Sequence, residues 1–125
     1  MITVKDWMSK PVISVKTGTT VEEAAITMAK HNVGSIIISD DGRTAKGIIT
    51  ERDLLKKILG AKQDPKKLNV EDIMSKKVVM VDAKSSLLEI SKIMTKNIMR
   101  RVIVTENDRF IGIVTSRDLL QLMAG

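Results

Sequence analysis

The chain has 125 residues, of which 43% are hydrophobic and 29% charged, a size that suits one globular domain or two small subdomains sharing a core. It contains no cysteine and one histidine, so disulfides, thiolate nucleophiles and clusters of Cys or His around a metal are excluded. No apolar run approaches the roughly 18 residues of a membrane span, and the first ten residues lack the apolar region of a signal peptide. These features predict a soluble, cytoplasmic protein with no catalytic residues, no metal site and no required cofactor.

Chain order gives the following elements. A short turn or helix at 5–8 leads into an extended segment at 11–15, and Thr19 opens an amphipathic helix through the capping box Thr19–Glu22. A β-branched run at 35–39 and the polar turn DDGR come next, followed by an extended segment at 46–50 and a helix at 52–59. The methionines at 28, 74, 94, 99 and 123 fall on apolar faces and are expected in the core.

The second half of the chain repeats the first. VKDWMSKPVISV at 4–15 matches VEDIMSKKVVMV at 70–81 at an offset of 66, and GIITERDLL at 47–55 matches GIVTSRDLL at 112–120 at an offset of 65. The order strand–helix–strand–strand–helix therefore occurs twice. We predict a first domain at 1–62, a linker at 63–69 and a second domain at 70–125.

The fold class predicted from this order is α/β (α+β). Two units related by a pseudo-twofold axis are each β-α-β-β-α, with a short three-stranded sheet packed on two helices. The strand runs are apolar at nearly every position, so both faces of each sheet should be covered.

Thr-x-Arg-Asp occurs in both copies where the last strand gives way to a helix, and two interpretations compete. Thr50 and Thr115 stand at the expected N-cap, with Asp53 and Asp118 three residues later, which is the spacing of a capping box. Alternatively, each motif binds a ligand, because a short Asp can accept bonds from vicinal ribose hydroxyls and a helix N-terminus beside an Arg can bind phosphate. The glycine before each motif, at 47 and 112, admits either a ligand or another backbone.

These segments resemble a family. DWMSKPVISV and DIMSKKVVMV, VGSIIISD and RRVIVTEN, and GIITERD and GIVTSRD together are similar to the motifs of a tandem pair of CBS (cystathionine β-synthase) domains, also called a Bateman module. The resemblance implies a regulatory module that binds AMP, ADP, ATP or S-adenosylmethionine in clefts between the two units. It also implies a homodimer that regulates a separate, unidentified partner protein, unless the chain is part of something larger.

The resemblance assigns residues to two sites. Asp53 and Asp118 would hold ribose, and Thr50 and Thr115 ribose or phosphate, with Arg52 and Arg117 beside them. Main chain and apolar side chains would flank adenine, at Ile13, Val33, Gly34, Ile48, Val79, Met99, Arg100 and Ile113. Each site would be built across the copies, with Ile13 facing the Asp118 site and Val79 the Asp53 site.

The two copies differ in charge. Glu51 in the first motif corresponds to Ser116 in the second, and Gly34-Ser35 corresponds to Arg100-Arg101. A carboxylate repels a bound phosphate and arginines bind one, so the Asp118 site is predicted to bind phosphorylated ligand more tightly. Arg100-Arg101 can also be read as an exposed strand start. Two alternatives to a nucleotide sensor remain, namely nucleic-acid binding through the +6 charge and a structural dimerisation module whose motifs only cap helices.

Overall fold

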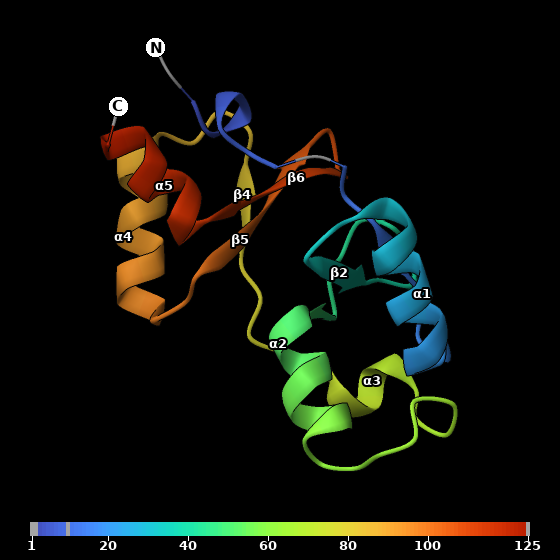
Figure 1. Cartoon of the computed structure of the whole chain (residues 1–125). Helices are drawn as coiled ribbons and strands as arrows, with labels where there is room; N and C mark the ends of the chain where they lie inside the picture. The colour runs from blue at the N-terminus through green and yellow to red at the C-terminus, as the bar shows by residue number, and fades with distance from the viewer. Residues whose placement is uncertain (1–2, 10, 125) are drawn as a thin grey trace. The chain divides into compact units, whose positions relative to one another are not determined.

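The computed structural model describes residues 3–9 and 11–124, so the outermost ends of both predicted domains lie outside the described residues. The chain forms two compact units. The first unit is Ile13–Val78, and the second unit combines Met1–Val12 with Val79–Gly125. Figure 1 shows the elements of both units, coloured along the chain.

The first unit contains a three-stranded sheet in the order β1-β2-β3, with β1 parallel and β3 antiparallel to β2. Its elements are β1 (Ser14–Val15), α1 (Val21–His31), β2 (Ser35–Ile38), β3 (Gly47–Thr50), α2 (Glu51–Leu54), η2 (Leu55–Leu59), a π-helix, and α3 (Val70–Ile73). The last predicted helix of this repeat therefore begins one residue earlier than expected, and its second half widens into a π-turn that Gly60 N closes on Leu55 O at 2.7 Å.

The second unit repeats this topology with strand order β4-β5-β6. Its elements are η1 (Val4–Asp6), a 3₁₀-helix, β4 (Met80–Asp82), α4 (Leu87–Asn97), β5 (Arg101–Glu106), β6 (Arg109–Thr115) and α5 (Ser116–Met123). Helices α4 and α5 lie side by side against this sheet (Figure 1). The α+β class and the two three-stranded sheets predicted from the repeat are confirmed.

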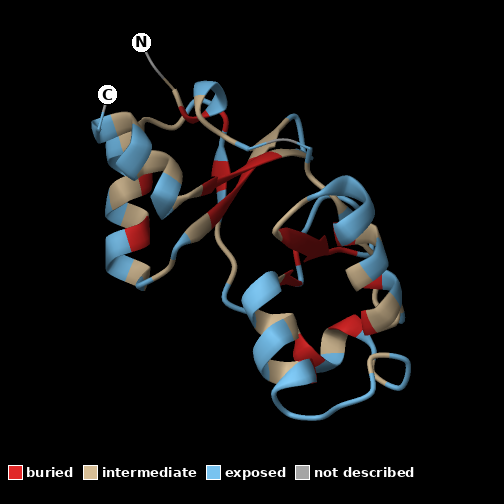
Figure 2. Ribbon diagram, viewed as in Figure 1, coloured by how far each residue is buried: buried red, intermediate tan, exposed pale blue. Residues whose placement is uncertain are grey.

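Each core combines residues from both sequence repeats. β2 is buried along its whole length (Figure 2). In the first unit Val70 and Ile73, which begin the second repeat, join the apolar cluster of α1, β2 and β3. In the second unit Val4, from the first repeat, joins the cluster of α4, β5 and β6 and is fully buried. The segment that opens each repeat therefore packs in the other repeat's unit.

Backbone hydrogen bonds fix these leading segments in place. In the first unit Val21 N donates to Leu68 O at 2.9 Å, and Val70 N donates to Thr19 O at 2.9 Å, so the predicted linker bonds to the start of α1. In the second unit Val4 N donates to Ser85 O at 3.2 Å. The bond from Val21 to Leu68 also satisfies an amide at the N-terminus of α1 that has no partner within the helix.

The capping box predicted at Thr19–Glu22 is wrong by one residue. The N-cap of α1 is Thr20, whose hydroxyl accepts the Glu23 amide at 3.1 Å, and the matching cap of α4 is Ser86. The shift arises because the carbonyl of Thr19 accepts the amide of Val70, the first residue after the predicted linker. Thr19 therefore pairs with that segment, and the helix begins after Thr20.

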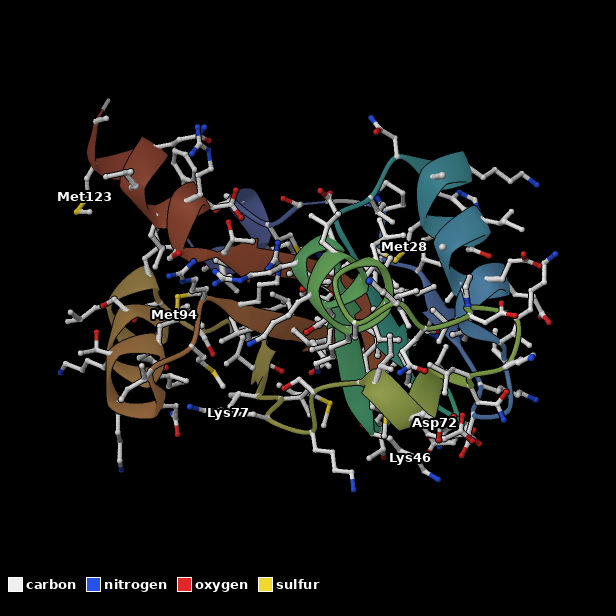
Figure 3. All side chains as sticks on the ribbon, turned by 60° about the horizontal axis from the view of Figure 1, so that its bottom comes forward. Met28, Lys46, Asp72, Lys77, Met94 and Met123 are labelled. Carbon is white, nitrogen blue, oxygen red and sulfur yellow. The ribbon has the colours of Figure 1, made fainter. Side chains whose placement is uncertain are left out.

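The predicted core methionines are only partly confirmed. Met28 and Met94 are buried, and Met74 and Met99 are half-buried against the cores. Met123 is 78% exposed, because it lies in the last turn of α5, beyond the strands it would need to contact (Figure 3).

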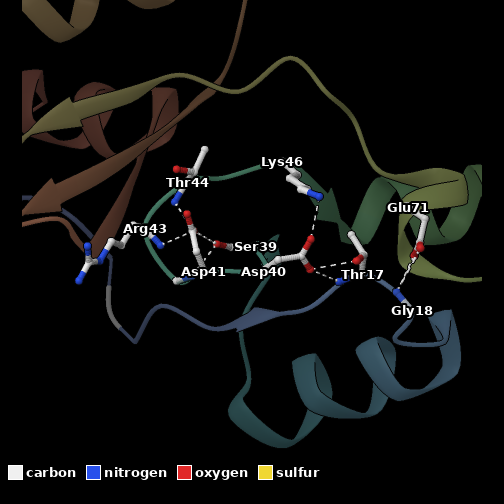
Figure 4. A network of polar contacts seen from close by, with 10 residues as sticks. Thr17, Gly18, Ser39, Asp40, Asp41, Arg43, Thr44, Lys46 and Glu71 are labelled. Atoms are coloured by element: carbon white, nitrogen blue, oxygen red, sulfur yellow. Dashed lines mark hydrogen bonds and ion pairs between the residues drawn. The ribbon is translucent and has the colours of Figure 1, made fainter.

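The turn between β2 and β3 is built around two aspartates (Figure 4). Asp40 accepts the Thr17 amide at 2.9 Å and pairs with the Lys46 ammonium at 2.7 Å. Asp41 accepts the amides of Arg43 and Thr44, each at 2.8 Å. Because Lys46 and Thr17 donate to it, the pKa of Asp40 falls to about 2. The amides of Thr44 and Arg43 likewise lower the pKa of Asp41 to about 2.

Candidate functional site

Both Thr-x-Arg-Asp motifs form complete capping boxes. In the first unit Asp53 N donates to the Thr50 hydroxyl at 3.2 Å, and Thr50 N donates back to Asp53 Oδ2 at 2.9 Å. In the second unit the same two bonds join Thr115 and Asp118 at 3.1 and 2.8 Å. The capping interpretation is therefore confirmed, and in both copies the short Asp closes a box that Glu or Gln usually closes.

Capping uses one oxygen of each carboxylate and leaves the other. Asp118 Oδ2 accepts the Thr115 amide, and Asp118 Oδ1 has no hydrogen-bond partner among the described residues. Asp53 Oδ1 instead lies 3.3 Å from the ammonium of Lys57. A carboxylate that caps a helix through one oxygen can therefore still offer the other to a ligand, and the two copies differ in how free that oxygen is.

A hollow of about 650 Å³ opens at the N-terminus of α5 in the second unit. The residues that line it are Arg100, Arg101, Thr115, Ser116, Arg117 and Leu120. Three arginines, two residues that carry hydroxyls and the first turn of α5 thus line one hollow, a combination that favours a bound anion. Asp118 is not among the lining residues, and the capping box joins it to Thr115, which is.

The matching positions of the first unit carry no such excess of positive charge. Gly34, Ser35 and Glu51 occupy the places of Arg100, Arg101 and Ser116. In both units the same backbone bond joins the strand start to the helix start, from Glu51 N to Gly34 O at 3.1 Å and from Ser116 N to Arg100 O at 2.8 Å. The scaffold is therefore shared, and the side chains on it differ.

The remaining predicted site residues lie just before strands and on α2. Ile13 and Val79 precede β1 and β4, and their carbonyls accept the amides of Ile37 and Ile103 at 3.0 and 2.9 Å. Val33 and Met99 are half-buried against the two cores. Arg52 is exposed on α2. The structure brings Gly34, Thr50 and Asp53 together in the first unit, and Arg100, Thr115 and Arg117 in the second.

Ile48 and Ile113, the other predicted adenine contacts, are buried in β3 and β6. Ile48 exchanges two backbone bonds with Ser75, at 3.0 and 2.9 Å. Ile113 does the same with Ser9, at 3.2 and 2.7 Å. The main chain of both residues is thus occupied by the leading segment that packs in each unit.

The glycine before each motif meets protein rather than open space. A Cβ atom on Gly47 would lie 2.5 Å from the sulfur of Met74, and one on Gly112 would collide with the side chain of Met8. Close approach of another backbone is therefore seen at Gly47, where the Ser75 carbonyl oxygen would lie 2.9 Å away, whereas at Gly112 the close neighbour is a side chain.

Sequence reasoning missed Lys57, whose ammonium contacts both Asp53 and the carbonyl of Ile73. Its position four residues after an acidic side chain on one helix is the signal that would have found it. Among the described residues, no group of three His, Cys, Asp or Glu side chains is placed to hold a metal. Within the same part of the chain, no helix has the length and apolar composition to cross a bilayer.

The fold and the paired motifs define a tandem α+β module in which the same Thr–Asp capping box begins a helix in each unit. The chain belongs to the CBS domain family, whose model matches residues 4–60 and 70–125. It is thus a CBS domain pair, a class of regulatory module.

Relatives match nearly the whole chain. An uncharacterised protein of Methanopyrus kandleri is 36% identical over 97% of this chain, which spans 62% of that protein. Hypoxic response protein 1 of Mycobacterium tuberculosis is 33% identical over 95% of the chain and 83% of its own length. The CBS domain pair of protein MJ0100, solved with 5′-methylthioadenosine and S-adenosyl-L-methionine, is 31% identical with a TM-score of 0.79 and covers 100% and 98% of the two chains.

Proposed function

We propose that this CBS pair is a sensor of adenosyl ligands, among them AMP, ADP, ATP and S-adenosylmethionine. The observation that carries the proposal is the carboxylate of Asp118, which caps α5 through one oxygen and leaves the other without a described partner, at a helix start where Thr115 and three arginines line a hollow. A vicinal diol can donate to that oxygen while a phosphate binds the guanidinium groups. A similar CBS pair was solved with two adenosyl compounds bound.

The second unit is proposed as the site for phosphorylated ligands. Arg100, Arg101 and Arg117 line its hollow, whereas the first unit places Glu51 next to its motif. Guanidinium groups form charge-assisted hydrogen bonds with phosphate, and a carboxylate at phosphate distance repels it. The first unit would thus be better suited to an adenosyl ligand without phosphate.

The module is proposed to act as a regulator rather than an enzyme, with no resident cofactor. With one histidine and no cysteine in the chain, the motifs offer hydroxyls, carboxylates and guanidinium groups that bind a ligand without a paired base to activate a nucleophile. Ligand binding would shift an equilibrium between conformations, and a separate protein partner would recognise this change.

A homodimer is proposed because α4 and α5 expose an apolar surface that a second copy of the chain would bury. Leu88, Leu120 and Met123 are 64%, 58% and 78% exposed, and an apolar groove of about 410 Å³ runs between these helices. Exposed apolar patches of this kind mark protein interfaces. Oligomeric relatives exist, including a hexameric CBS protein from cyanobacteria with the same fold.

Isothermal titration calorimetry tests the proposal with AMP, ADP, ATP, S-adenosylmethionine, NAD(H) and a short RNA. The variants are Asp53→Asn and Asp118→Asn, because an asparagine oxygen can still accept the Thr amide of the capping box while the negative charge is lost. Asp108→Asn, in the exposed β5–β6 turn, is the charge-matched control. We expect Asp118→Asn to weaken AMP binding at least tenfold and the control to leave it unchanged.

Two other outcomes would replace the proposal. Binding of RNA that falls steeply with salt and is insensitive to both Asp variants would indicate a nucleic-acid-binding protein. No binding of any ligand, combined with lower stability of the Thr50→Ala and Thr115→Ala variants, would leave the motifs as helix caps alone.

A further inference from the structure

Lys57 forms an ion pair with Asp53, the carboxylate of the first motif. Its ammonium lies 3.3 Å from Asp53 Oδ1 and donates to the carbonyl of Ile73 at 2.7 Å. The two anchors come from different elements, since Asp53 is in α2 and Ile73 ends α3. The Asp53 side chain is only 18% exposed, so this ion pair is partly shielded from water.

The hydrogen-bonding capacity of Asp53 is therefore largely used within the protein. Its Oδ2 accepts both the amide and the hydroxyl of Thr50, at 2.9 and 3.1 Å, and its Oδ1 faces Lys57. A carboxylate has about four lone-pair sites, of which two accept hydrogen bonds here, while the ammonium of Lys57 lies 3.3 Å from the other oxygen in an ion pair. Two vicinal hydroxyls donating to Asp53 must compete with at least one of these bonds.

The second motif has no equivalent of this lysine. The offset of 65 that aligns the two motifs places Leu122 at the position of Lys57. Among the described residues Asp118 accepts only the Thr115 amide, so Oδ1 and part of Oδ2 are open. The two carboxylates share a capping geometry but differ in their availability to a ligand.

We propose that Lys57 is an internal competitor for Asp53, which lowers the affinity of the first unit for ribose-containing ligands so that the Asp118 site fills first. The inference rests on the proposed function, since it assigns a specificity-determining residue to the same pair of sites. A ligand that takes both oxygens of Asp53 has to separate its ion pair with Lys57, and this cost is absent at Asp118. Lys57 is therefore a second cause of unequal ligand affinity between the two sites, in addition to the phosphate-binding arginines.

Two other roles of Lys57 predict different results. A purely structural lysine would hold η2 to the end of α3, and its removal would lower stability without changing how the site discriminates between ligands. A lysine that contacts ligand phosphate would strengthen binding, so its removal would weaken AMP binding. Only a competitor for the ribose-binding carboxylate predicts tighter binding on removal, and only for ligands with an intact diol.

Adenosine and 2′-deoxyadenosine test the proposal, because neither carries a phosphate that would respond to a change in net charge. Calorimetry is run on the Asp118→Asn protein, in which the first site is isolated, with and without Lys57→Leu, the residue of the second repeat. Lys56→Leu, an exposed neighbour, removes the same charge and is the matched control. Circular dichroism confirms folding, and Lys57→Met replaces Lys57→Leu if the latter does not fold.

We expect Lys57→Leu to tighten adenosine binding three- to tenfold, to raise the preference for adenosine over 2′-deoxyadenosine by a similar factor, and Lys56→Leu to change neither. In the Asp53→Asn protein, Leu122→Lys should weaken adenosine binding at the second site. Unchanged or weaker adenosine binding in Lys57→Leu would overturn the inference while leaving the sensor function intact. Absence of adenosyl binding by the wild-type protein would overturn both.

Discussion

Gly47 in β3 and Ser75 approach so closely that a Cβ atom on the glycine would lie 2.9 Å from the carbonyl oxygen of Ser75. That oxygen accepts the Ile48 amide at 3.0 Å and cannot move away without breaking the bond. Gly47→Ala should therefore destabilise the protein by about 1–3 kcal/mol, the usual range for overpacking. Urea unfolding followed by circular dichroism measures the loss.

A second substitution, at Met74, distinguishes the side-chain contact of Gly47 from its backbone contact. Met74→Ala in the Gly47→Ala background relieves the clash with the methionine sulfur and leaves the clash with the Ser75 carbonyl. We expect partial recovery only. A full recovery of stability would show that the side chain alone requires glycine at this position.

Stability should fall in acid as the β2–β3 turn protonates. The pKa values of Asp40 and Asp41 are about 2 in the folded protein, below the ordinary 3.8, because Lys46 and backbone amides donate to these carboxylates. Between these values the unfolded chain binds more protons, so their contribution to folding is complete above pH 4 and is lost as the pH falls through about 2. Urea midpoints measured from pH 5 to pH 2 should show a smaller decline in Asp40→Asn than in the wild type.

Phosphate selectivity should follow the charge at residue 116. Ser116→Glu introduces the residue of the first repeat into the arginine-lined hollow. A carboxylate near a bound phosphate costs roughly 1 kcal/mol or more, so AMP affinity should fall at least fivefold while adenosine affinity stays nearly constant. Competition calorimetry with both ligands checks this, and equal loss for the two would indicate a general distortion of the site.

Dimer formation should depend on the apolar face of α4. Leu88→Glu places a charge on a side chain that is 64% exposed in the single chain, so it should leave the fold intact and give a monomer. Light scattering coupled to size exclusion measures the mass, and Lys92→Glu, an exposed position one turn later, is the control. A dimer that persists in Leu88→Glu would place the interface elsewhere.

The sequence predicted the positions of helices and strands better than it predicted which segments pack together. Local patterns were sufficient for β2 and for the caps at Thr50 and Thr115, because a short β-branched run and the capping spacing are each encoded within a few residues. The packing of Val4 on the second repeat and of Val70 on the first could not be predicted, since both contacts depend on tertiary pairing. The one-residue error at Thr19 has the same origin, because a bond from Val70 decides which threonine caps α1.

The candidate site shows the same limit. The Asp and Thr positions could be read from the motif, whereas the availability of each carboxylate oxygen could not. That availability depends on where Lys57 reaches, and the lysine is held by the carbonyl of Ile73, sixteen residues further along the chain. A long flexible side chain has no preferred partner in sequence, so only the packed structure shows which oxygen it contacts.

The packing of each leading segment in the other repeat's unit also orders the events of synthesis. The first unit is one continuous stretch and can fold once residue 78 has left the ribosome. The second unit cannot, because Ser9 bonds to Ile113, which is translated about 100 residues later, or roughly 5–20 s at ordinary elongation rates. During that interval Val4 has no core to enter, so the segment around Val4 and Ser9 packs only after residues that are translated much later.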